Sequence, residues 1–303
     1  MGIVRTPTRA VPRWDDVLPP QSWVRIAVLT GLLTLAYGHV LMGMVGKWLH
    51  DANWSHGWLV PLFSVFFLVT RRAQLLYCRP RTNWIGGVIL VAALTLYFVS
   101  AWRLRMGYPQ AVSLVVAIFG LTLLMGGWSV VRIAWFPIVF LLLAVPLPQS
   151  VYVDLTMPLR KFASQVSAVV MPWFAPGLHA EPQAVVIDYV MPGRGSGQLN
   201  VEEACSGMRS IMAFVTLGVA MAYLHERPTW QRIALLASCV PIAVLCNTIR
   251  VTITGLMYVY DRQELARGTP HELLGVAMFL VALGMYSALG YALSNFFVEE
   301  REG

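Results

Sequence analysis

The sequence predicts an all-α polytopic membrane protein: a bundle of about eight transmembrane helices with a small extracytoplasmic amphipathic helix and a β-hairpin. Two observations predict this fold class. Of the 303 residues, 57% are hydrophobic and only 12% are charged, whereas soluble domains carry roughly 25% charged residues. Long apolar runs also recur along the chain, as bilayer-crossing helices require. We attribute the net charge of +7 to membrane topology and not to nucleic-acid binding.

The apolar runs define one transmembrane domain, residues 24–303, after a cytoplasmic tail, residues 1–23. The tail is polar, contains proline and carries three arginines. No small-residue cleavage site closes the first run, which is therefore interpreted as a retained anchor helix and not a signal peptide. The second and fifth runs are short for a bilayer that needs about 20 residues. The eight predicted spans are 24–46, 57–69, 84–101, 109–126, 130–145, 208–224, 233–258 and 273–297.

Basic residues predict the orientation of these spans. With eight spans, the short loops on the side of the N-terminal tail carry more of the basic residues than those on the other side. Since cytoplasmic loops are enriched in lysine and arginine, both chain ends are predicted in the cytoplasm. The long loop of residues 146–204 then lies outside.

This outer loop contains two predicted elements. Apolar residues recur at helical spacing over residues 154–173, with Arg160 and Lys161 between them, which predicts an interfacial amphipathic helix. Residues 184–190 and 199–201 are rich in strand-forming residues and flank a glycine-rich stretch. That pattern favours a small hairpin, and a flexible loop is the alternative.

Cys205 stands where the outer loop meets the sixth apolar run. If the chain is helical from Ser206, then Cys205 and Arg209 share a face one turn apart, and the sulfur lies near the amide-rich start of the helix. Both features favour a thiolate, the nucleophilic form of cysteine; the alternative is a small buried hydrophobe. No spacing typical of a metal site is present, so neither a metal nor a cofactor is expected. The remaining cysteines are Cys78, Cys239 and Cys246. They are expected to be inert, with Cys246, one turn from Arg250, as the possible exception.

Arg250 and Asn247 interrupt the seventh apolar run. At about 1.5 Å per residue, Arg250 is predicted roughly 12 Å below Tyr258, the outer end of this helix. An arginine inside a membrane is costly unless it is paired or solvated, so a functional role is the default hypothesis. The alternative is a structural arginine that caps carbonyl groups or pairs with Glu202 or Glu203.

His271 opens the last span, in the segment Thr269-Pro270-His271-Glu272. Thr269 as cap and Glu272 three residues later form a predicted capping box, which gives Glu272 a structural task. At a helix start the dipole disfavours an imidazolium, which keeps His271 available as a base. A merely interfacial histidine is the alternative.

The predicted topology brings Cys205, Arg250 and His271 together in the outer half of the membrane, from three consecutive spans. A thiolate can attack a carbonyl carbon, an imidazole can carry the proton, and a guanidinium can stabilise an oxyanion. These are the groups that an acyl-transfer enzyme requires.

At these residues the sequence resembles the exosortase and archaeosortase family of integral-membrane cysteine transpeptidases. The matching motifs are Cys205-Ser206-Gly207-Met208-Arg209, Asn247-Thr248-Ile249-Arg250, His271-Glu272, Trp54-Ser55-His56-Gly57 and Val145-Pro146-Leu147-Pro148. Methionine stands at position 208, where leucine is commoner in the family.

The resemblance implies a protein-sorting protease of exopolysaccharide-producing bacteria, in the inner membrane with its active site facing the periplasm. Its implied partners are exported proteins with a PEP-CTERM-type tail, the lipid bilayer, and an acceptor that is water or an amine-bearing lipid or glycan. The resemblance makes Cys205 the nucleophile, His271 the proton carrier and Arg250 the oxyanion or positioning group. It assigns no role to His56, which is expected at the membrane interface. The supporting residues are Arg209, Asn247, Glu272 and Ser206.

Two other functions remain open at this point. A purely hydrolytic intramembrane protease would leave a bare carboxyl end on its product. A transporter or exopolysaccharide-export component would use Arg250 to bind an anionic substrate, and would tolerate Cys205→Ser but not Arg250→Ala.

Overall fold

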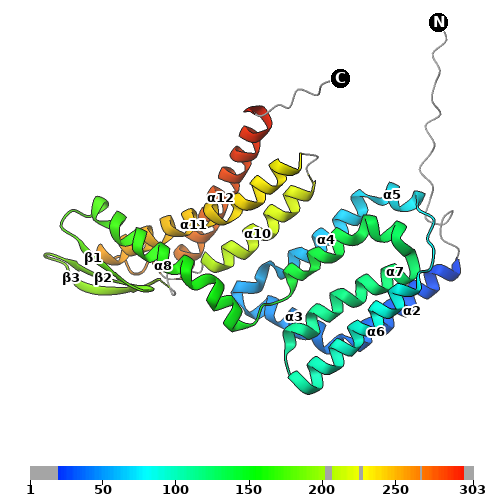
Figure 1. Cartoon of the computed structure of the whole chain (residues 1–303). Helices are drawn as coiled ribbons and strands as arrows, with labels where there is room; N and C mark the ends of the chain where they lie inside the picture. The colour runs from blue at the N-terminus through cyan, green and yellow to red at the C-terminus, as the bar shows by residue number, and fades with distance from the viewer. Residues whose placement is uncertain (1–19, 202–206, 225–227, 267, 297–303) are drawn as a thin grey trace, which may run out of the picture. The chain divides into compact units, whose positions relative to one another are not determined.

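The computed structural model describes residues 20–201, 207–224, 228–266 and 268–296. The predicted nucleophile, Cys205, lies outside these ranges, as do Ser206, Glu202 and Glu203. The chain separates into two compact units, which Figure 1 shows together and which we describe one at a time. The first unit comprises residues 1–51 and 57–146, and the second comprises residues 52–56 and 147–303.

The first unit consists of helices. Helices α2 and α3 are bent by 70° at their junction. The elements are α2 (Pro20–Ala36), α3 (Gly38–His50), α4 (Leu59–Thr70), α5 (Arg72–Tyr77), α6 (Trp84–Val99), η2 (Ser100–Leu104), α7 (Gly107–Phe140) and η3 (Leu141–Ala144). The short helix η1 (Ala52–Trp58) follows α3 in the sequence, and its residues 52–56 belong to the second unit.

Helix α7 turns back on itself at Gly127, as Figure 1 shows. Gly127 has a left-handed φ of 68°, which favours glycine. The hydroxyl groups of Tyr37 and Ser113 are hydrogen-bonded to each other, and the indole N–H of Trp48 donates a hydrogen bond to the carbonyl of Ala144. Tyr37 and Trp48 lie near the two ends of the short helix α3. A straight helix would separate Ser113 from Ala144 by about 46 Å, so α7 has two limbs. They correspond to the predicted spans 109–126 and 130–145.

The first limb of α7 packs tightly on α6 through glycines. A Cβ on Gly86 would collide with the backbone of Leu124, and one on Gly120 would lie 2.8 Å from the backbone nitrogen of Leu90. Small residues let apolar helices approach closely, which is how helices pack inside membranes. The second limb packs on α4 through an aromatic cluster, Phe63, Phe67, Phe136 and Phe140.

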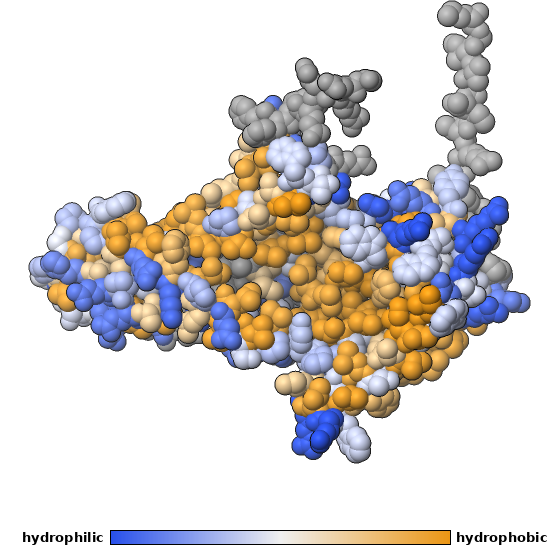
Figure 2. All heavy atoms as spheres, in the orientation of Figure 1, coloured by the Kyte–Doolittle hydropathy of each residue, from blue (hydrophilic) through white to orange (hydrophobic). Residues whose placement is uncertain are grey.

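In the described ranges, the second unit combines the helices α8, α10, α11 and α12 with a small sheet. Figure 2 shows hydrophilic residues gathered over the sheet, whereas apolar residues cover the helices. Its elements are α8 (Gln149–Phe174), β1 (His179–Gln183), β2 (Val186–Met191), β3 (Gly195–Asn200), α10 (Gly207–Leu224), α11 (Thr229–Val259) and α12 (Gly268–Phe296).

Helix α8 is longer than the predicted residues 154–173. Its small and polar residues are buried, including Arg160, which is only 6% exposed, while Phe162 and Val169 are more than half exposed. Ser167 donates a hydrogen bond to the carbonyl of Thr248 and accepts one from the hydroxyl of Thr252. The polar face therefore packs on α11, and the position of α8 at a membrane interface stays a prediction.

The sheet is antiparallel with strand order β1-β2-β3. The predicted hairpin corresponds to β2 and β3, joined by a turn at residues 192–194, and β1 is an additional strand that was not predicted. One face of the sheet, with Ile187, Leu199 and Val201, packs on α8 and α11 in a shared hydrophobic core. This packing anchors the sheet at the C-terminal end of α11.

The eight predicted spans are not confirmed. Among the described residues, four helices are long and apolar enough to cross a membrane, and the bent pair α2–α3 is a fifth candidate. Helix α4 has 12 residues, fewer than a bilayer requires. The four long candidates are Trp84–Leu104, Gly107–Ala144, Thr229–Val259 and Gly268–Asn295.

Candidate functional site

Arg250 of α11 and His271 of α12 form a hydrogen-bonded pair in the second unit. Nη2 of Arg250 lies 2.8 Å from Nε2 of His271 and donates a second hydrogen bond, 3.2 Å long, to the backbone carbonyl of His271. The arginine side chain is only 3% exposed. The structure therefore brings together two of the three residues that the sequence singled out, which lie 21 positions apart.

This hydrogen bond specifies the state of the imidazole. A guanidinium has five N–H donors and no acceptor, so Nε2 of His271 must be the acceptor. The ring is then neutral, with its proton on Nδ1. A neutral imidazole held by a cation is a proton acceptor, and it gains that capacity at Nε2 once the guanidinium moves away.

Gly275 shapes the site by having no side chain. A Cβ at this position would lie 3.2 Å from both terminal nitrogens of Arg250 and 3.3 Å from its guanidinium carbon. The guanidinium therefore lies directly against the first turns of α12. Sequence reasoning missed Gly275, although its spacing of one turn from His271 places both residues on one helix face.

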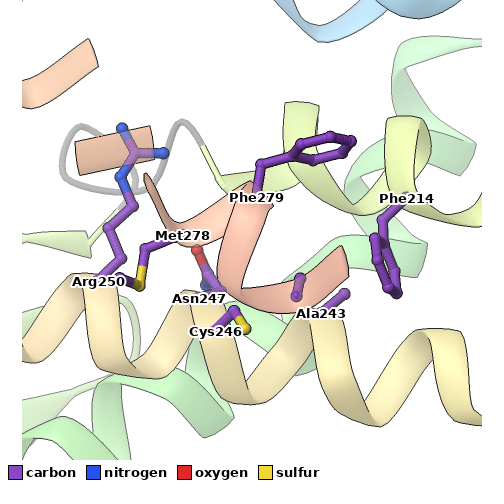
Figure 3. Close-up of a pocket in the computed structure, with 8 residues that line it drawn as sticks. Phe214, Ala243, Cys246, Asn247, Arg250, Met278 and Phe279 are labelled. Carbon is purple, nitrogen blue, oxygen red and sulfur yellow. The ribbon is translucent and has the colours of Figure 1, made fainter. Parts of the chain in front are cut away.

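A small cavity of about 20 Å³, enough for one water molecule, is lined in part by Arg250 (Figure 3). Its polar walls are Asn247 and Arg250, which are one turn apart on α11. Asn247 is 7% exposed, so the predicted supporting residue is buried next to Arg250. The remaining lining residues are Phe214, Ala243, Cys246, Met278, Phe279 and Ala282.

Helix α10 begins at the level of this pair. It runs antiparallel to α11, because Gly218 contacts Cys239 while Phe214, one turn earlier, shares the cavity wall with Ala243. When this register is extended to Gly207, the first described residue of α10, the residue of α11 at the same level is Arg250. Helix α12 follows α10 in the same way. The hydroxyl of Tyr286 donates a hydrogen bond to the carbonyl of Gly218, and Phe279, two turns nearer the start of α12, packs on Phe214, one turn nearer the start of α10.

The predicted nucleophile precedes this helix start. Cys205 and Ser206 lie outside the described residues, and of Arg209 only the helical backbone is described. The described part of helix α10 begins at Gly207.

Glu272 is exposed, and α12 begins at Gly268, one residue before the predicted cap Thr269. Among the described residues, Glu272 makes no hydrogen bond or ion pair.

The cysteines other than Cys205 occupy different surroundings. Cys239 is buried against Gly218, and Cys246 is buried in the cavity wall. Cys78 is half-buried in the first unit, where its thiol bonds the carbonyl of Ser129.

His56, expected at the membrane interface, is buried in the second unit with an exposure of 4%. Its ring centroid lies 5.7 Å from that of Trp54, which in turn packs on Tyr152 of α8. Tyr152 and Arg160 share one buried face of α8. A lone histidine between tryptophans carried no signal for this burial.

A family model described as transmembrane exosortase matches residues 48–288, a range that includes Arg250, His271 and most of both units. No curated protein and no solved structure matches the chain.

Proposed function

Because the chain belongs to the transmembrane exosortase family, we propose that it is a membrane-embedded cysteine peptidase and transpeptidase. Its substrates are exported proteins with a C-terminal PEP-CTERM-type sorting tail. The enzyme cleaves near the sorting motif and transfers the new carboxyl end to a surface acceptor through a thioester. It works in the inner membrane, with both chain ends cytoplasmic and its site facing the periplasm.

The observation that carries the proposal is the contact between the buried guanidinium of Arg250 and the part-buried imidazole of His271, 2.8 Å apart. A cation buried within an apolar helix, beside a neutral base, is costly to keep inside a membrane protein. They are the two groups that must act on either side of a tetrahedral intermediate. The start of α10 lies at the same level, and Cys205 precedes it by two residues.

In the first step, Arg250 turns from the imidazole to the carbonyl oxygen of the scissile bond, which releases Nε2 of His271. Cys205 then loses its proton to Nε2, and the thiolate attacks the scissile carbonyl carbon. The carbonyl oxygen becomes an oxyanion as the carbon–sulfur bond forms, and the guanidinium stabilises the new charge. One side-chain movement thus serves both roles.

In the second step, the intermediate collapses. The carbon–nitrogen bond breaks, the imidazolium returns its proton to the leaving amine, and a thioester remains on Cys205. Water or an amine then attacks the thioester while His271 takes the proton of this nucleophile. The thiol leaves and recovers its proton, so the enzyme returns to its starting state with a free acid or an amide as product.

The supporting residues act around this centre. The amide of Asn247 lines the cavity beside Arg250 and orients the guanidinium or a water molecule there. Arg209 in the first turn of α10 and Ser206 assist the thiolate, and Glu272 favours the start of α12 through the helix dipole.

Cysteine replacement tests the proposal. In cells that co-express a tail-bearing substrate, Cys205→Ala abolishes the processed form on a gel. The matched control replaces the other three cysteines, Cys78, Cys239 and Cys246, with alanine and retains processing. Normal processing by Cys205→Ala would refute the mechanism.

Mass spectrometry of the processed substrate separates transfer from hydrolysis. We expect an added head group on the new carboxyl end. A bare carboxyl end, with Cys205 still required, would show that the enzyme is a protease that uses water only.

A further inference from the structure

The two edges of the small sheet differ in their capacity to bind another strand. The strand order β1-β2-β3 leaves the outer edges of β1 and β3 without a fourth strand among the described residues. An open edge presents backbone N–H and C=O groups that can pair with an extended chain.

The hydrogen bond from Val201 N to Val185 O identifies which backbone groups of β3 point outward. In an antiparallel pair, hydrogen-bonded and non-hydrogen-bonded residues alternate. The register is continuous from Val186↔Asn200 to Met191↔Gly195, so Gly197 and Leu199 bond β2. Ser196 and Gln198 therefore direct their N–H and C=O groups to the outer edge, and both are exposed.

The opposite edge is blocked by proline. By the same alternation, the outward-facing residues of β1 are Ala180 and Pro182. Proline has no N–H, and proteins use it to protect sheet edges against unwanted pairing. The chain protects the edge of β1 and leaves that of β3 unprotected.

The unprotected edge leads toward the candidate active site. The side chain of Leu199 in β3 lies against Gly255 of α11, where a Cβ would be 3.1 Å from Cδ2 of Leu199. Arg250 is five residues earlier on α11, about 7.5 Å along its axis. Past Val201, which is fully buried in the same core, the chain continues toward Cys205.

We infer that the outer edge of β3 is a substrate-binding strand: it pairs with the extended polypeptide segment next to the scissile bond through the backbone groups of Ser196 and Gln198. This inference rests on the proposed peptidase function and names how its substrate is held. Backbone pairing accepts varied side chains, and it presents a peptide bond in the extended form that a nucleophile can reach. The occupant is thus a polypeptide backbone and not a lipid or a glycan.

Substrate peptides with single N-methyl groups test the pairing. The probe is a synthetic peptide that carries a tail's cleavage point and the six residues before it, the length of β3. Each backbone amide is N-methylated in turn, and cleavage by the full chain in detergent is measured. We expect kcat/KM to fall about tenfold at every second position, as the loss of one or two hydrogen bonds predicts. A flat profile, or one without this period of two, would overturn the inference.

A pair of proline variants tests the same edge from the enzyme's side. Gln198→Pro removes an outward N–H from β3, and Ala180→Pro makes the matched change on the edge of β1. If each variant keeps the thermal unfolding transition of the wild-type protein, we expect Gln198→Pro to raise KM about tenfold and Ala180→Pro to leave KM unchanged. Equal effects of the two variants would count against β3.

The experiments distinguish a wrong proposed function from a wrong strand-pairing inference. If Cys205→Ala still cleaves the unmodified peptide, the proposed function is wrong. If cleavage needs Cys205 but is indifferent both to N-methylation and to Gln198→Pro, then only the strand-pairing inference is wrong.

Discussion

Gly275 of α12 faces the guanidinium of Arg250 so closely that a Cβ would lie 3.2 Å from both of its terminal nitrogens. The absence of a side chain at Gly275 lets the cation reach the ring and the carbonyl of His271 on the same helix. The position of the guanidinium thus depends on a residue with no functional group of its own.

Gly275→Ala should therefore impair catalysis with little effect on folding. The new methyl group displaces the guanidinium by a few tenths of an ångström, and misplaced catalytic groups lower the rate by about tenfold or more. The processing rate and the thermal unfolding of the purified variant measure the two effects. Gly284→Ala is the matched control on α12, because a Cβ there meets nothing within 4 Å. Equal rates for the two variants would exclude a positioning role for Gly275.

Arg250→Lys should not restore activity, although it keeps the charge. A lysine ammonium lacks the planar fork with which Nη2 of Arg250 reaches both Nε2 and the carbonyl of His271. We expect the processing rate to fall by about 10² or more, as for loss of an oxyanion-stabilising donor. Arg262→Lys, at an exposed position of the same unit, is the control. Wild-type rates in Arg250→Lys would show that only a positive charge is needed.

Gly218→Ala should destabilise the protein because its Cβ would collide with the sulfur of Cys239. Overpacking of this kind costs about 1–3 kcal/mol. The midpoint of thermal unfolding in detergent should fall, and it should recover in the double variant Gly218→Ala/Cys239→Ala, which lacks the sulfur. No recovery would mean that the register of α10 against α11 is not set by this contact.

Neighbouring glycines of α6 should respond in opposite ways. A Cβ on Gly86 collides with the backbone of Leu124, which cannot move aside easily, whereas one on Gly87 lies 3.7 Å from the side chain of Leu124. Gly86→Ala should lower the unfolding midpoint. Gly87→Ala should leave it unchanged or raise it, since alanine favours a helix by about 1 kcal/mol over glycine. Similar losses in both variants would refute the close packing of α6 on α7.

Composition and hydropathy sufficed to predict a helical, multi-pass membrane protein, because apolar length is a local property of the chain. The number of spans was not a local property. The turn of α7 at Gly127 depends on a left-handed backbone that also accommodates Arg81, and the 70° bend between α2 and α3 lies within one apolar run. Neither feature changes the hydropathy of the sequence.

The orientation of α8 shows why burial could not be read from periodicity alone. The apolar stripe of α8 predicted that the helix has an apolar face and a polar face, but not which of the two packs against the rest of the protein. In a soluble protein the apolar face turns inward, whereas Arg160 and Ser167 turn inward here, and Phe162 is exposed. Beside a bilayer the exposed face can remain apolar, so small and polar residues become the contact surface.

The sequence by itself singled out Arg250 and His271, because an arginine within an apolar run is costly and a histidine at the start of another run can act as a base. Only the tertiary structure decided that they touch, that Nε2 accepts the hydrogen bond, and that Gly275 makes room for it. The reason is physical: the cost of a buried charge belongs to one residue and is visible in the sequence. A 2.8 Å contact belongs to the packing of two helices, whose register is set by close-packed surfaces along their whole length.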